Sequence, residues 1–159
     1  MQLKLKTFGT VVAASALGLT LPALADSPKG ADGPEALAKA IVTHLKVGDV
    51  KALTALLPPD DVLKRVVTCG GDDDDDIVEE VAETRRKVDR IAKKFGKLTF
   101  ERLEVEKTRD VAAGGRIEGC VANEAVGWFE GELEFSRDED LDVDLLRVGE
   151  RWYLVELDD

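Results

Sequence analysis

Few of the residues that build most catalytic and metal sites occur in this sequence. Its 159 residues include one histidine, two cysteines, two tryptophans and one tyrosine. It contains no G-x-S-x-G, no H-E-x-x-H, no glycine-rich phosphate loop and no C-x-x-C pair. We therefore assign no catalytic, cofactor-binding or metal-binding residue from the sequence, and we expect no cofactor.

Basic residues are also scarce relative to acidic ones. There are 22 lysines and arginines against 33 aspartates and glutamates, which gives a net charge of −11. Nucleic acids and anionic membranes are bound through clustered lysine and arginine side chains. We expect neither as a partner and interpret the acidity as a source of solubility.

Long apolar runs are missing except at the N-terminus. Lys4 and Lys6 precede residues 7–25, which carry no charge, and residues 23–25 read Ala-Leu-Ala. A short positive start, an apolar run and a small-x-small site are typical of a cleavable secretory signal peptide. Residues 1–25 are therefore predicted to be a signal peptide, which places the protein in the periplasm or outside the cell.

The chain after this segment is predicted to be one domain. Residues 26–33 are polar and rich in proline and glycine, which favours a flexible leader. Residues 34–159 are then long enough for one hydrophobic core. Removing residues 1–25 takes away two lysines, so the net charge falls from −11 to −13, and no stable membrane insertion is expected.

The two cysteines, Cys69 and Cys120, both lie in the predicted mature chain. In an oxidising compartment an isolated pair most often forms a disulfide, which we expect here. Closing a loop of about 50 residues would stabilise the fold by about 4 kcal/mol at most. A redox-active or metal-binding pair is the alternative, which a C-x-x-C spacing would have favoured.

Helical periodicity dominates the first half of the mature chain. Pro34 opens a stretch with apolar residues at helical spacing that ends at Gly48. Asp49 is expected to cap a second helix, and Asp60 or Asp61 a third. The strongest pattern covers residues 77–95, with acids early, bases late and a glycine stop after it.

From Leu98 onward the period changes to two, which indicates strands. Leu98 and Phe100 alternate on one parity and Leu103 and Val105 on the other, so a bulge is expected near residues 101–102. Further strands are expected at residues 117–121, 129–135, 141–148 and 152–157, with a type II′ turn at residues 149–150. This order predicts an α+β fold, with N-terminal helices packed on a curved antiparallel four- to five-stranded sheet.

The final hairpin carries a family resemblance. Residues 145–157 read Leu-Leu-Arg-Val-Gly-Glu-Arg-Trp-Tyr-Leu-Val-Glu-Leu. This segment resembles the last hairpin of small exported bacterial proteins of the nuclear-transport-factor-2-like, or cystatin-like, superfamily. The resemblance implies a cone-shaped α+β fold over residues 34–157. It transfers no catalytic residue, because the superfamily includes enzymes, binding modules and domains of unknown function.

Two acidic clusters are candidate cation sites. Residues 72–76 are five consecutive aspartates before the strongest helix, where they suit the positive end of its dipole better than the spaced ligands of calcium. The second cluster suits a solvated strand face better than a metal site, and it comprises Asp138, Glu139, Asp140, Asp142 and Asp144. A weak acidic divalent-cation binder remains an alternative function.

The single histidine and the aromatic strand residues are the remaining candidates. His44 lies on the apolar stripe of the first helix, where a structural histidine is the favoured interpretation. The alternative is a cone-fold enzyme that pairs His44 with an acid such as Glu104 or Asp142. Trp128, Trp152 and Tyr153 are expected to pack in the core rather than to line a ligand cavity.

These observations together favour a non-enzymatic exported domain. The predicted signal peptide, the cysteine pair and the lack of a catalytic motif all agree with that interpretation. The domain is expected to bind or scaffold an unknown small molecule or protein. Neither its ligand nor its oligomeric state follows from the sequence.

Overall fold

The computed structural model describes residues 30–70 and 76–159. Four helices and seven strands occur in this part of the chain. The helices are α1 (Pro34–Val47), α2 (Val50–Thr54), α3 (Asp60–Val66) and α4 (Ile77–Phe95). The strands are β1 (Val67–Cys69), β2 (Phe100–Val111), β3 (Arg116–Ile117), β4 (Cys120–Ala122), β5 (Val126–Phe135), β6 (Glu139–Val148) and β7 (Arg151–Asp158).

The fold is α+β, as predicted, but it has two antiparallel sheets instead of one. The larger sheet has the order β2-β5-β6-β7 and the smaller one the order β1-β4-β3. The continuous strand predicted for residues 117–121 is divided because Glu118 and Gly119 both have positive φ angles, of 33° and 69°. The backbone turns there, so that β3 and β4 pair with each other.

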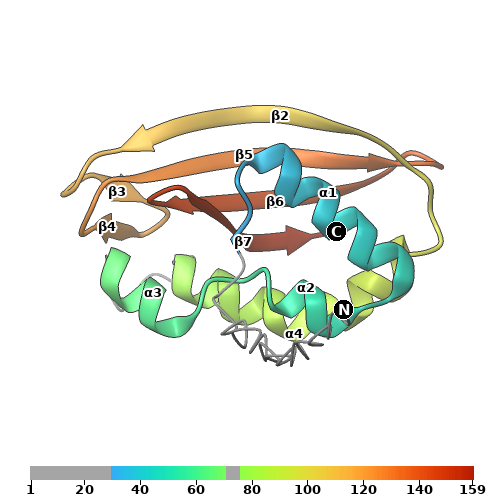
Figure 1. Ribbon diagram of the computed structural model, residues 1–159, viewed down its shortest axis with the longest axis horizontal. Helices are drawn as coiled ribbons and strands as arrows, with labels where there is room; N and C mark the ends of the chain where they lie inside the picture. The colour runs from blue at the N-terminus through green and yellow to red at the C-terminus, as the bar shows by residue number, and fades with distance from the viewer. Residues whose placement is uncertain (1–29, 71–75) are drawn as a thin grey trace, which may run out of the picture.

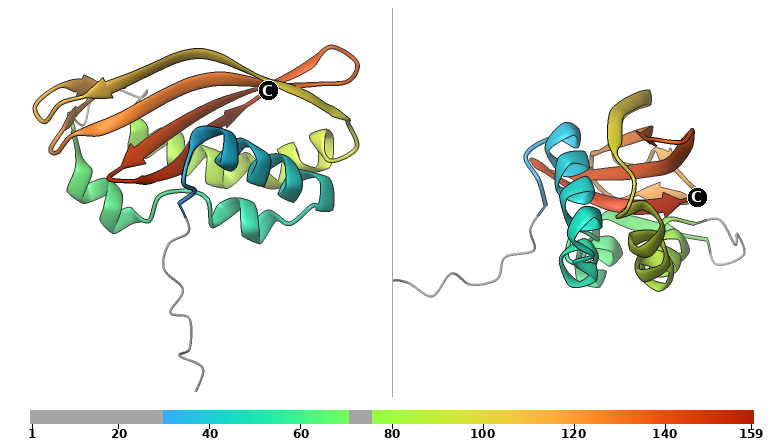
Figure 2. Two further views of the ribbon diagram at one scale, coloured as in Figure 1. Left: turned by 45° about the horizontal axis from the view of Figure 1, so that its top comes forward. Right: turned by 90° about the vertical axis from the view of Figure 1, so that its right-hand side faces the viewer.

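The helices do not form an uninterrupted N-terminal block either. Strand β1 lies between α3 and α4 in the chain, so a strand interrupts the series of helices. It pairs with β4. Figure 1 shows α2, α3 and α4 below the larger sheet, and α1 in front of its strands. Figure 2 shows α1 and α4 on the same side of that sheet, and the two helices contact each other and β7.

Capping side chains start two of the helices where the sequence predicts them. The Asp49 carboxylate accepts a hydrogen bond from the Ala52 amide at 3.0 Å, and the Asp76 carboxylate accepts from the Val78 and Glu79 amides at 2.9 Å. The predicted cap of α3 is wrong. Pro59 is its N-cap and Asp60 is already the first helical residue, because proline holds the extended backbone that precedes a helix.

The bend of β2 arises from irregular pairing with β5. One register shift lies between Phe100 and Arg102, as predicted, and a second lies between Val105 and Lys107. The β6–β7 hairpin also agrees with the prediction, since only Gly149 of its two loop residues has a positive φ, of 60°. That conformation is typical of a type II′ turn.

Much of the core lies between the helices and one face of the larger sheet, and Trp128 and Leu146 are buried on the opposite face. We call the face toward the helices the core face, and on β5 it presents Phe129, Leu133 and Phe135, all at most 2 % exposed. Glu130, Glu132 and Glu134 alternate with them on the opposite face, which we call the outer face. At the β7 edge, the Leu157 amide donates to the buried Thr84 hydroxyl of α4 at 3.2 Å, so α4 satisfies part of that edge.

The start of the described chain is tied to the sheet. Ala31 exchanges two backbone hydrogen bonds with Trp152, at 2.9 and 3.0 Å. The predicted signal peptide at residues 1–25 and the first part of the predicted leader lie outside the described residues. Across residues 30–70 and 76–159, no helix is long and apolar enough to cross a membrane.

Candidate binding groove

An open groove runs between α1 and the edge strand β2 and has a volume of about 500 Å³. Residues spaced along one side of α1 form one wall, and the first residues of β2 form the other. The groove is lined by Glu35, Ala38, Lys39, Val42, Thr43, Lys46, Phe100 and Leu103. At about 1.5 Å per helical residue, the helix wall is ~16 Å long.

Small side chains on α1 leave this space open. Ala38 and Val42 are small, buried and face the groove from α1. Phe100 is held in place by an edge-to-face contact with Phe135, with ring centroids 5.8 Å apart. The groove therefore has an apolar floor that continues the hydrophobic core outward to solvent.

The charges at the rim of the groove are mostly positive. Lys39 and Lys46 are both exposed, and neither forms an ion pair with any described residue. Glu35 is the single acid in the lining. The net charge of the chain is −11, but the rim of this groove carries two unpaired lysines and one acid.

The outer face carries a different cavity, of about 320 Å³, which is strongly acidic. It spans β2, β5, β6 and β7 and is lined by Glu106, Glu130, Gly131, Glu132, Asp142, Asp144 and Glu156. Glu130, Asp144 and Glu156 lie directly opposite one another across three strands, as do Glu132, Asp142 and Asp158. Like charges in such positions repel each other.

Asp144 is the most strongly affected group in this acidic cavity. Burial, followed by the neighbouring Glu156 and Glu130 carboxylates, raises its pKa to about 7. Burial also raises the pKa of Glu156 and of Asp142. Among the described residues, no side chain donates a hydrogen bond to Asp144. At neutral pH the carboxylate of Asp144 is therefore only partly ionised.

Basic partners offset the charge at the borders of the acidic cavity. Burial disfavours the charge of Glu130, but hydrogen bonds from Lys107 and Trp128 outweigh it and lower its pKa. A hydrogen bond from Lys87, 2.8 Å from Asp158, lowers the pKa of that carboxyl. The unpaired acids are thus concentrated in the middle of the outer face.

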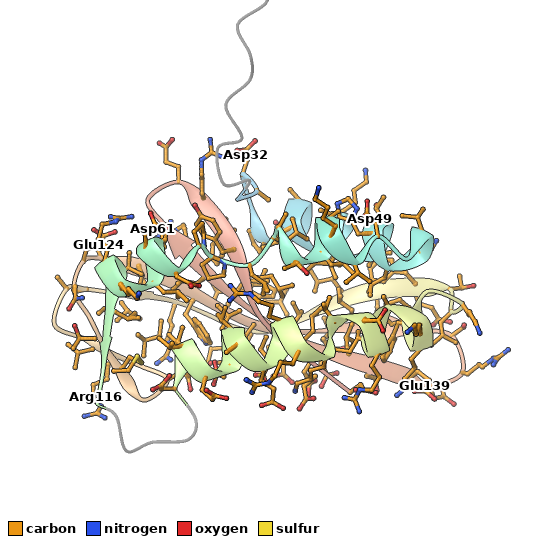
Figure 3. All side chains as sticks on the ribbon, turned by 90° about the horizontal axis from the view of Figure 1, so that it is seen from below. Asp32, Asp49, Asp61, Arg116, Glu124 and Glu139 are labelled. Atoms are coloured by element: carbon orange, nitrogen blue, oxygen red, sulfur yellow. A yellow bond between two sulfur atoms is a disulfide. The ribbon has the colours of Figure 1, made fainter. Side chains whose placement is uncertain are left out.

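The second predicted acidic cluster is only partly assembled. Asp142 and Asp144 share the outer face, as predicted, and both line the acidic cavity. Glu139 instead pairs with Lys94 near the end of α4, at 3.0 Å (Figure 3). Asp138 has a positive φ of 57° and lies in the β5–β6 turn. The structure therefore does not gather the five acids around one point.

The structure does not bring the predicted histidine and acid pair together. His44 lies on α1, which packs against the core face. Glu104 and Asp142 are on the outer face, because they alternate with the inward-facing Leu103 and Leu141. His44 is partly exposed and forms no side-chain hydrogen bond or ion pair with the described residues.

The aromatic strand residues are packed, as predicted. Trp128 is fully buried and donates from its indole nitrogen to Glu130 at 2.8 Å. Trp152 makes an edge-to-face contact with Phe129 on the core face. Tyr153 is 5 % exposed. None of the three lines the groove between α1 and β2.

Cys69 and Cys120 form the predicted disulfide. They are direct cross-strand partners in β1 and β4, and 51 positions separate them in sequence. Of the five predicted acids at residues 72–76, four lie outside the described residues. The fifth, Asp76, is close to the disulfide, and its capping role agrees with the favoured interpretation of this cluster.

The groove between α1 and β2 was not predicted from the sequence. The sequence feature that corresponds to the groove is a second apolar row on α1, formed by Ala38 and Val42 beside the predicted stripe. This row could be recognised as a groove wall only once the position of β2 was known. Comparisons with protein-family models, curated proteins and solved structures gave no significant match to this chain. The geometry of the chain itself must therefore carry any functional interpretation.

Proposed function

We propose that this protein is an exported, non-enzymatic binding domain that holds an anionic amphiphile in the groove between α1 and β2. The chemical class is an alkyl carboxylate or a similar molecule, with an apolar body and one negative head. The observation that carries the proposal is an apolar floor of Ala38, Val42, Phe100 and Leu103 beside two unpaired lysines. The floor would take up the apolar body, and Lys39 or Lys46 would attract the head.

The dimensions of the groove agree with this class of ligand. Small-molecule sites in proteins are concave, mostly apolar and about 300–1,000 Å³ in volume, with a few polar groups that fix orientation. The groove has a volume of about 500 Å³. The acidic cavity on the outer face would repel an anion, so the charge distribution favours the groove for the head group.

The proposal extends two expectations drawn from the sequence. The disulfide and the lack of a membrane-spanning helix among the described residues suit an exported domain. The resemblance of residues 145–157 to the nuclear-transport-factor-2-like superfamily suits a binding module, because that superfamily contains them. A cone-shaped arrangement of the curved sheet and helices is part of this proposal.

The test is a titration of the mature chain, residues 26–159, with dodecanoate and with the anionic dye anilinonaphthalene sulfonate. Leu103→Asp places a negative charge on the groove floor and should weaken both ligands about tenfold or more. Val105→Asp is the matched control. Val105 lies on the same strand and face but outside the groove lining, and it is already 53 % exposed.

Two further results decide the proposal. Lys39→Glu combined with Lys46→Glu should weaken dodecanoate more than dodecanol, because only the carboxylate interacts with the lysines. Far-ultraviolet circular dichroism of each variant checks that the fold is retained. Absence of saturable binding by the folded wild-type chain would refute the proposal, as would equal losses for Leu103→Asp and Val105→Asp.

A further inference from the structure

Three potential metal ligands converge where the smaller sheet meets α4. Cys69 ends β1, Cys120 begins β4, and Asp76 is the N-cap of α4. The two Sγ atoms and one carboxylate oxygen of Asp76 all lie within 4.8 Å of one another. Among the cysteine, histidine, aspartate and glutamate side chains of the described residues, these three lie close enough together to hold one ion.

The carboxylate of Asp76 is positioned by the helix that it caps. Its Oδ1 atom accepts hydrogen bonds from the Val78 and Glu79 amides, both at 2.9 Å. Its Oδ2 atom accepts no hydrogen bond from the described residues. Ligating carboxylates in metal sites are commonly held in this way, with one oxygen fixed by the protein and the other free for the ion.

The disulfide is what prevents this group from binding a metal ion. Thiolates ligate metals well, whereas the sulfurs of a disulfide carry no negative charge to donate. Cys69 is partly exposed and Cys120 is fully buried, so a reductant and an ion can approach from the side of Cys69. The donor set of two sulfurs and one oxygen suits Zn²⁺ and similar thiophilic cations, whereas Ca²⁺ requires six to eight oxygens.

We propose that reduction of the Cys69–Cys120 disulfide opens a site for a thiophilic divalent cation, with both thiolates and Asp76 as ligands. A dithiol reductant supplies two electrons and two protons, so that the S–S bond becomes two thiols and the reductant becomes a disulfide. The cation then displaces a proton from each thiol as it forms two metal–sulfur bonds. The fourth tetrahedral position is left to water.

The three donor atoms already lie close to the spacing that one tetrahedral ion requires. Zinc binds sulfur at about 2.3 Å and carboxylate oxygen at about 2.0–2.2 Å, so ligand atoms around one tetrahedral ion lie roughly 3.5–4 Å apart. Cys69 and Cys120 are direct cross-strand partners in β1 and β4, and a carboxylate oxygen of Asp76 lies within 4.8 Å of both sulfurs. Once the S–S bond is reduced, each cysteine side chain is free to rotate between staggered conformations while the β1–β4 backbone pairing is kept.

The test uses the mature chain reduced with dithiothreitol and desalted without oxygen. It is titrated with Co²⁺, whose thiolate complexes show a sulfur-to-cobalt charge-transfer band, and the Co²⁺ is then displaced with Zn²⁺. The reduced chain should show the band at one ion per chain, release about two protons per ion and melt at a higher temperature with Zn²⁺. The oxidised chain should show none of these effects.

Asp76→Asn is the decisive variant, because asparagine caps helices as well as aspartate but removes the ligating charge. It should weaken Zn²⁺ binding by the reduced chain about tenfold or more while leaving the oxidised chain equally stable. Asp60→Asn, at the start of α3, is the control and should not change the affinity. A reduced wild-type chain without the band would overturn the proposal. Equal affinities of wild type and Asp76→Asn would overturn it as well, whether or not the reduced chain is folded.

Discussion

The two faces of the larger sheet are made by alternate residues of the same strands, but different forces act on them. On β5, Phe129 and Leu133 are at most 1 % exposed and pack on the core face. Glu130 and Glu132, their immediate neighbours, line the acidic cavity on the outer face. The core face is held by burial of apolar area, and the outer face carries charges that repel one another across the strands.

The difference means that apolar burial elsewhere must offset the electrostatic cost of the acidic part of the outer face. The outer face buries Trp128 and Leu146 at one end, but the acidic cavity beside them is lined by carboxylates. The unpaired carboxylates there oppose folding wherever they are ionised. The high pKa of Asp144, about 7, reflects that cost, because burial and its neighbours disfavour the charge. The core face and the disulfide must therefore offset the repulsion on the outer face.

The largest expected effect comes from breaking the core face. Phe129→Ala should lower the free energy of unfolding by about 3–5 kcal/mol, because it removes a fully buried ring and leaves a cavity. Glu132→Ala, three positions along the same strand, should leave that free energy unchanged or raise it, because it removes an unpaired charge. Urea denaturation of both variants measures the contrast, and equal losses would mean that the two faces do not differ as described.

A smaller effect is expected from Asp144→Asn at neutral and alkaline pH. The folded-state pKa of Asp144 lies above its unfolded value, so the folded chain binds the proton more tightly. Its contribution to stability is present below about pH 4 and is lost as the pH rises through about 7. Removing the charge should therefore stabilise the protein by about 1–2 kcal/mol at pH 8, a value reduced for partial solvent screening.

The gain from Asp144→Asn should disappear as the pH falls toward 4, where the aspartate is protonated in both states. Asp140→Asn, on the same strand but exposed, removes the same formal charge and serves as the control. Thermal unfolding between pH 4 and 8 measures both variants. A gain for Asp144→Asn that is the same at every pH, or that is matched by Asp140→Asn, would contradict the assignment of the cost to the buried carboxylate.

The smallest effect is expected where a charge on the outer face is already paired. Arg102 contacts the Glu134 carboxylate at 2.6 Å and raises the stability of its ionised form, which lowers the pKa of Glu134. Arg102→Ala should weaken the fold less than either change above, and the loss should shrink in 1 M salt because exposed pairs are screened. Melting curves at low and high salt measure this, and a loss insensitive to salt would indicate packing instead.

Local patterns in the sequence predicted the elements that depend on local physics. The 77–95 helix, the Asp49 cap and the first bulge of β2 follow from periodicity and turn chemistry, and the structure confirms them. The disulfide followed from compartment and number of cysteines, and it is also confirmed. Each of these features is decided within one or two turns of chain, or by the small number of possible partners.

Features that depend on distant residues were missed. The second sheet requires positive φ angles at Glu118 and Gly119, and a non-glycine residue gives no sequence signal for that conformation. Strand β1 is too short to show a period and exists because β4 pairs with it. The groove is formed by the small side chains of Ala38 and Val42 on one wall and by Phe100 and Leu103 on the other. These two pairs are more than 55 positions apart in the chain.

The most direct test of the binding proposal is an NMR titration of the isotope-labelled mature chain with dodecanoate. The amide signals of residues 35–46 and 100–103 should shift in a saturable manner at one ligand per chain. The signals of Glu130, Asp144 and Glu156 on the outer face should stay in place. Saturable shifts centred on those outer-face residues, or no shifts at millimolar dodecanoate, would contradict the proposal.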